Sequence, residues 1–174
     1  MNTWRVTKYN PAFRDERGVY LRDEWTSISD VGRSFDGVEL TFDEYCKVED
    51  AYVSTILSFI SEASLDALTV TDLETYGVSE ARAEDLRGID CDPNAVRQRM
   101  LLSGGSIGDV CRLVLREVLW CKLESEGGFY IHFGYDYYMY IGSPVLSEQS
   151  IAYGRQQGLL VEDMESPYLD AGEA

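Results

Sequence analysis

The sequence predicts an α+β fold in which a small antiparallel sheet packs against three or four helices. Two segments carry strongly amphipathic helical patterns, and a third, rich in aromatic residues, is bounded by glycines and predicts a hairpin. The chain has 174 residues, without an internal repeat, a low-complexity stretch or a Pro/Ser-rich linker. Residues 1–174 are therefore expected to form a single domain.

The first forty residues are predicted to hold little regular structure. Residues 3–9 alternate in side-chain character and include β-branched residues, which favours a strand that ends at Asn10-Pro11. Residues 12–40 contain glycines and several charge pairs, so we expect a long connection with one short strand at 19–25.

The clearest predicted element is a helix at residues 42–63. Thr41 and Glu44 form a capping-box pattern at its start, and apolar side chains recur along one face. Glu49 projects from the centre of that apolar face. An unpaired carboxylate there would cost several kcal/mol, so we expect Glu49 to be buried against an arginine or a tyrosine hydroxyl.

The sequence next predicts a strand at 68–73. A charged and weakly helical stretch is expected at 79–88, and a further helix follows it. Asp92 and Pro93 are typical of a helix start, so this helix is expected to run to about residue 102. Gly104 can then supply the left-handed residue after its end.

A second amphipathic helix is expected at residues 107–118, with Ser106 as its N-cap. The Gly-rich segment 103–108 before it lacks the Gly-Lys-Ser/Thr of a phosphate-binding loop, so we expect an ordinary turn. Residues 119–124 also alternate as a strand, and no helix breaker separates the two patterns. The sequence leaves helix and strand open for this segment.

The last third of the chain is predicted to form a hairpin and a helix. Residues 129–141 are aromatic and β-branched, and Gly134-Tyr135-Asp136 is a plausible tight turn. Ser147 is expected to cap a helix to about residue 157, which Gly158 ends. An acidic tail is expected from about residue 162.

Charge is the most unusual property of the chain. Asp and Glu number 31 against 15 Lys and Arg, which gives a net charge of −16 and a pI near 4.3. Such a chain repels phosphate backbones and anionic membranes, so we expect neither nucleic acid nor a membrane as partner. It would attract a basic protein. Without a visible secretory leader or a long apolar run, a cytoplasmic location is expected.

Catalytic and metal-binding signals are weak. A Ser–His or Cys–His site would need His132, the only histidine, yet no nucleophile motif surrounds any serine or cysteine. The cysteines are scattered without a C-x-x-C pair, so no metal, cofactor or disulfide is expected. Among the many carboxylates, only Glu49 occupies a position that implies desolvation.

The predicted hairpin is the best candidate for a binding surface. We expect one face of it to stay partly exposed, because a domain this small cannot cover both faces. Tyrosine supplies large, stiff contact area with a polar tip. The expected partner-binding residues are Tyr130, His132, Tyr135, Asp136, Tyr137, Tyr138 and Tyr140.

In overall character the chain resembles the immunity proteins of bacterial toxin systems. The resemblance lies in its acidity, its α+β pattern and the lack of a catalytic motif. The segments 133–140 and 158–168 are also similar to segments of small bacterial proteins of this kind. The resemblance implies a non-enzymatic inhibitor of a cognate toxin, often a cationic nuclease. Two alternatives stay open: a small carboxylate-dependent hydrolase or other enzyme using Glu49, and an acidic adaptor or nucleic-acid mimic.

Overall fold

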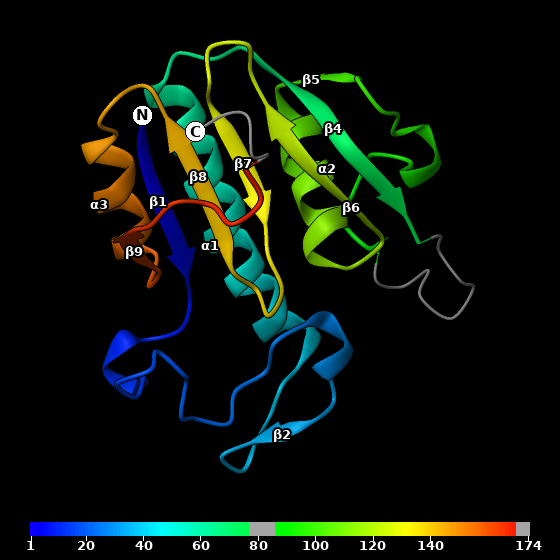
Figure 1. The fold of residues 1–174 in the computed structure, drawn as a ribbon. Coiled ribbons are helices and arrows are strands. Elements are labelled where there is room, and N and C mark those ends of the chain that lie inside the picture. Colours follow the sequence, from blue (N-terminus) through cyan, green and yellow to red (C-terminus); the bar gives the residue numbers. More distant parts are fainter. Residues whose placement is uncertain (77–85, 170–174) are drawn as a thin grey trace.

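A seven-stranded sheet forms the centre of the molecule, and three helices lie together behind it (Figure 1). The computed structural model describes residues 1–76 and 86–169. Every pair of neighbouring strands is antiparallel, in the order β5-β4-β6-β7-β8-β1-β9. This arrangement confirms the α+β class with one compact domain, and the sheet is larger than the sequence suggested.

The bounds of the elements are as follows. The large sheet contains β1 (Asn2–Thr7), β4 (Ala67–Thr75), β5 (Leu101–Ser103), β6 (Leu119–Glu124), β7 (Tyr130–Phe133), β8 (Met139–Ser143) and β9 (Leu160–Asp163). The helices are α1 (Phe42–Glu62), α2 (Gly105–Leu115) and α3 (Glu148–Gln156). A small ribbon pairs β2 (Ser34–Phe35) with β3 (Val38–Glu39).

The core lies between the helices and one face of the sheet. Alternate residues of each strand point toward α1 and α2, so that Trp4 packs on Phe59 at 5.3 Å between ring centroids. The opposite face carries polar and aromatic side chains, and the C-terminal segment 164–169 crosses it (Figure 1, red). The Met164 N–H donates to the Thr3 carbonyl at 3.2 Å, which ties this segment to β1.

The N-terminal connection differs from its prediction. The prediction of a strand at 19–25 is wrong. The structure describes all of these residues, and only Tyr20 forms a β-bridge, which pairs it with Arg14. Side chains order this region instead, because the Lys8 ammonium lies 4.2 Å from the Trp25 ring and 3.3 Å from the Glu24 carboxylate. The prediction also missed the β2–β3 ribbon.

The helix expected from Pro93 to about residue 102 is also wrong. Asp92 does cap the Asn94 N–H, but only a short 3₁₀ helix, Pro93–Ala95, follows. The chain then pairs with the edge of β4: the Arg99 N–H donates to the Val70 carbonyl at 2.8 Å, and β5 begins at Leu101. Sheet pairing overrides the local helix signal. Most of the predicted stretch 79–88 lies outside the described residues.

The ends of α2 and α3 also differ from their predictions. Ser106 does not cap α2: its hydroxyl donates to the Ser103 carbonyl, and Gly104 occupies the N-cap position with φ 55°. The open choice at 119–124 is resolved as β6. At α3 the Ser147 side chain makes no cap hydrogen bond, and the Glu62 carboxylate accepts from the Ser150 N–H instead, at 2.8 Å. The acidic tail expected from about 162 begins inside β9.

Candidate partner-binding surface

The structure distributes the seven predicted binding residues among three environments. Tyr130, His132 and Tyr140 lie on the sheet face that the C-terminal segment crosses, and all three are buried. Tyr137 is buried in the core. Tyr138 is half-buried, while Asp136 and Tyr135 are exposed. The expectation of one open hairpin face is therefore corrected: the exposed surface is concentrated at the turn.

The exposed residues lie on a strained turn between β7 and β8. The Tyr138 N–H donates to the Tyr135 carbonyl at 3.2 Å, and the Gly134 N–H donates to the Tyr138 carbonyl at 2.8 Å. Asp136 and Tyr137, the two central residues, both have left-handed backbones, with φ of 55° and 63°. Such turns usually use Asn-Gly, because a bulky side chain at positive φ costs about 1–3 kcal/mol.

Burial of the Tyr137 ring compensates this strain. Its ring meets those of Tyr52 and Trp25 edge-on, with centroids 5.0 and 5.1 Å away. The Tyr52 hydroxyl donates to the Tyr137 carbonyl at 2.8 Å and accepts from the Lys8 N–H at 2.7 Å. Burial raises the pKa of the Tyr137 phenol well above its ordinary value, so it stays neutral. The core thus holds the backbone of the turn, from which the exposed Tyr135 and Asp136 side chains project.

Acidic and aromatic side chains surround the turn and form a continuous surface. Tyr135 is 85 % exposed and Tyr76, at the end of β4, is 60 % exposed. We call the exposed set the Tyr135 surface; it consists of Glu74, Tyr76, Glu117, Tyr135 and Asp136. A hollow of about 300 Å³ beside it is lined in part by Thr26, Glu117 and Tyr137. Three carboxylates around two exposed rings suit a basic partner.

Glu49 is buried as predicted and is paired with two arginines. Its side chain is 0 % exposed. The Arg116 Nε donates to Oε1 at 2.7 Å, while Oε2 accepts from Arg116 Nη2 at 2.6 Å and Arg112 Nη1 at 2.8 Å. Arg112 also pairs with the exposed Asp50 at 2.7 Å. This bidentate arrangement stabilises the α1–α2 contact, and it keeps both Glu49 oxygens engaged in structural bonds.

His132 forms a buried network that includes residue types used in hydrolytic triads. Its Nδ1 lies 2.8 Å from the Ser166 hydroxyl, and its Nε2 lies 3.3 Å from the Glu124 carboxylate. A serine-protease triad places the serine on Nε2 and the carboxylate on Nδ1, the reverse of this order. His132 and Ser166 are also buried. The network therefore fixes the C-terminal segment onto the sheet.

Metal and membrane signals are absent from the described part of the chain. Residues 1–76 and 86–169 contain no group of three or more His, Cys, Asp or Glu side chains that could hold a metal ion. In the same residues no helix is long and apolar enough to cross a membrane. The four cysteines are free thiols, and burial raises the pKa of Cys121 to about 12, which keeps this thiol unreactive.

No family model, curated protein or solved structure matches this chain. Tyr135 and Asp136 of the Tyr135 surface were among the residues predicted from the sequence, whereas Glu74, Tyr76 and Glu117 were not. Glu117 occupies a left-handed position directly after α2, with φ 57°, and only the fold brings it beside the hairpin turn. Nothing in the local sequence around these three residues points to that contact.

Proposed function

We propose that this protein is a non-enzymatic inhibitor of the immunity type, which binds a basic protein toxin through the Tyr135 surface. The observation that carries the proposal is an exposed tyrosine on a turn held by the core, with three carboxylates around it. Tyrosine anchors contribute strongly to protein interfaces because they add area at little entropic cost. Rigid presentation lowers the ordering cost of binding.

The charge of the whole chain supports the same function. A net charge of −16 produces a negative field that extends beyond any single contact. Such a field accelerates the encounter with a basic protein and disfavours nucleic acid, whose phosphates it repels. An inhibitor that must reach a toxin before the toxin reaches its target gains from this rapid association.

The environment of Glu49 favours binding over the hydrolase alternative. A general acid or base needs an oxygen that can reach substrate, whereas both oxygens of the fully buried Glu49 accept hydrogen bonds from the guanidinium groups of Arg116 and Arg112. The adaptor or nucleic-acid mimic would use the same acidic surface and differs only in its partner. Identification of the partner therefore separates these two functions.

The experiment captures partners from the native host with the wild-type chain and with Tyr135→Ala in parallel. Leu101→Ala is the matched control, because Leu101 is 68 % exposed and lies on the edge strand β5. We expect a basic protein that Tyr135→Ala retains poorly and Leu101→Ala retains fully. Expressed alone it should be toxic, and co-expression of the wild-type chain should restore growth. A non-toxic partner, or equal capture by all three chains, would contradict the proposal.

A further inference from the structure

A smaller hollow lies beside Tyr135 and is lined mostly by aromatic residues. Its volume is about 170 Å³. The lining comes from the end of β4, from β6, from the end of β7 with the turn that follows it, and from the C-terminal segment: Glu74, Tyr76, Trp120, Phe133, Gly134, Tyr135 and Tyr168. Five of these seven residues are aromatic and Glu74 adds a carboxylate. The Phe133 side chain belongs to the core, and its carbonyl accepts from Trp120, so Tyr76, Trp120, Tyr135 and Tyr168 are the rings available to a ligand.

Two of the rings are fixed by contacts within the protein. The Trp120 indole N–H donates to the Phe133 carbonyl at 2.9 Å, which sets the orientation of the indole. The Tyr168 ring lies 6.1 Å from Trp120 between centroids, at an interplanar angle of 59°. The Tyr168 N–H donates to the Ser166 hydroxyl, and this hydroxyl also lies within hydrogen-bond distance of His132 Nδ1. The network described above therefore also positions a wall of this hollow.

Gly134 allows the Tyr168 ring to close the hollow. A Cβ at this position would lie 3.3 Å from the Tyr168 hydroxyl oxygen and 3.4 Å from its Cε2. A side chain here would push against the ring. Tyr76 and Tyr135 form the exposed rim, and the Tyr76 hydroxyl donates to Glu74 Oε2 at 3.2 Å. Glu74 thus adds a negative charge at the rim.

We propose that this hollow is a binding site for an organic cation with an alkylammonium head. Aromatic rings attract a cation over their faces, tryptophan most strongly, and cages of several rings bind quaternary ammonium groups. The Glu74 carboxylate adds a Coulombic attraction and excludes anionic ligands. An uncharged apolar ligand would gain nothing from that carboxylate. The hollow shares Glu74, Tyr76 and Tyr135 with the Tyr135 surface, but binding of a small cation needs no protein partner.

The test titrates the whole chain with choline and follows the Trp120 indole N–H resonance by NMR. The matched ligand is 3,3-dimethylbutan-1-ol, which has the same shape without the charge, and sodium chloride controls for ionic strength. We expect a saturable shift with choline and none with the neutral alcohol. A titration with Nα-acetyl-lysine amide separates the sources: tighter choline indicates a free quaternary ligand, and tighter lysine amide indicates a protein side chain.

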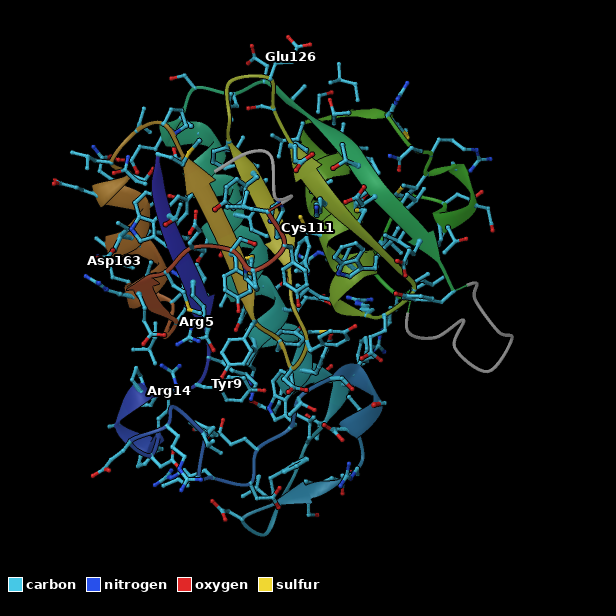
Figure 2. The ribbon with its side chains drawn as sticks, viewed as in Figure 1. Arg5, Tyr9, Arg14, Cys111, Glu126 and Asp163 are labelled. Carbon is cyan, nitrogen blue, oxygen red and sulfur yellow. The ribbon has the colours of Figure 1, made fainter. Side chains whose placement is uncertain are left out.

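Variants test the assignment of residues. Glu74→Gln and Tyr135→Ala should each weaken choline binding by about threefold or more, while Tyr135→Phe should keep it because the ring remains. Glu126→Gln removes the same charge at the opposite end of the sheet, on the β6–β7 turn (Figure 2), and should change nothing. No saturable response to choline, an equal response to the alcohol, or equal affinity in all variants would overturn the proposal. Because no partner is needed, that failure would leave the proposed inhibitor function standing.

Discussion

Replacement of Glu49 by Gln tests the buried ion pair between Glu49 and Arg116. The Arg116 side chain is 3 % exposed and Glu49 is 0 % exposed, so solvent screens their interaction little. Glutamine keeps one carbonyl acceptor but removes the charge that neutralises Arg116 and much of Arg112. Loss of one partner from a buried pair leaves an uncompensated charge, which costs about 3–5 kcal/mol. We expect Glu49→Gln to lower the free energy of unfolding by about 3 kcal/mol, since part of the hydrogen bonding remains.

Urea unfolding, followed by circular dichroism, measures this loss directly. The matched control is Asp50→Asn, because Asp50 pairs with the same Arg112 but is 64 % exposed. An exposed pair contributes about 0–1 kcal/mol, so the control should stay close to wild type. In a chain of this size, 3 kcal/mol corresponds to a fall of about 6–12 °C in melting temperature.

Two results would refute this reasoning. Glu49→Gln within about 1 kcal/mol of Asp50→Asn would mean that Arg116 does not depend on the Glu49 charge. Glu49→Gln that folds with wild-type stability but abolishes a measurable turnover would favour the enzyme alternative instead. A double variant, Glu49→Leu with Arg116→Met, provides an internal check. It should recover much of the lost stability, because apolar residues of similar volume can replace a buried pair.

The remaining predictions concern packing, pH and metal dependence. Gly142→Ala should destabilise the fold by about 1–3 kcal/mol, since its Cβ would lie 2.1 Å from the Tyr130 ring, whereas Gly127→Ala has room and should cost little in the same urea assay. Burial alone would raise the pKa of Glu162, but hydrogen bonds and charge from Arg14 and Arg5 (Figure 2) outweigh it and lower the pKa below 4.5. In acid the unfolded chain therefore binds more protons than the folded chain. As the pH falls through and below 4.5, the free energy of unfolding of wild type should decrease more than that of Glu162→Gln. Parallel plots of unfolding free energy against pH for the two chains would contradict this. A chelator and a reducing agent should leave the melting temperature within about 5 °C, roughly 1–2 kcal/mol, because the core needs neither metal nor disulfide.

The sequence predicted an element correctly where the residues of that element determine its structure. Thr41 accepts from the Glu44 N–H at the start of α1, and the apolar face of that helix is buried for most of its length, although Leu57 is 39 % exposed. The β7–β8 hairpin follows from its bounding glycines and β-branched residues. Asp36-Gly37 is the strongest kind of hairpin signal, and its left-handed φ values of 50° and 80° show that the β2–β3 ribbon was also predictable.

Other features depend on contacts that no local pattern contains. β5 exists because β4 offers an edge to pair with, which overrides the Asp92-Pro93 helix start. Tyr130 and Tyr140 are buried on the sheet face that a segment about thirty residues later crosses, as the contacts of Ser166 with His132 and of Tyr168 with Tyr140 show. Tyr137 adopts a left-handed backbone because its ring is held by Trp25 and Tyr52. The sequence could suggest a tyrosine-rich surface but not which tyrosine it exposes.

Binding kinetics of the purified toxin partner test the central claim most directly. Surface plasmon resonance would compare wild type, Tyr135→Ala and Leu101→Ala at low and physiological salt. We predict that association slows as salt rises in all three chains, because the steering field is screened over roughly 8–10 Å. Tyr135→Ala alone should dissociate faster, by about 30-fold if it removes about 2 kcal/mol. Salt-independent association, together with equal dissociation of Tyr135→Ala and Leu101→Ala, would contradict the account.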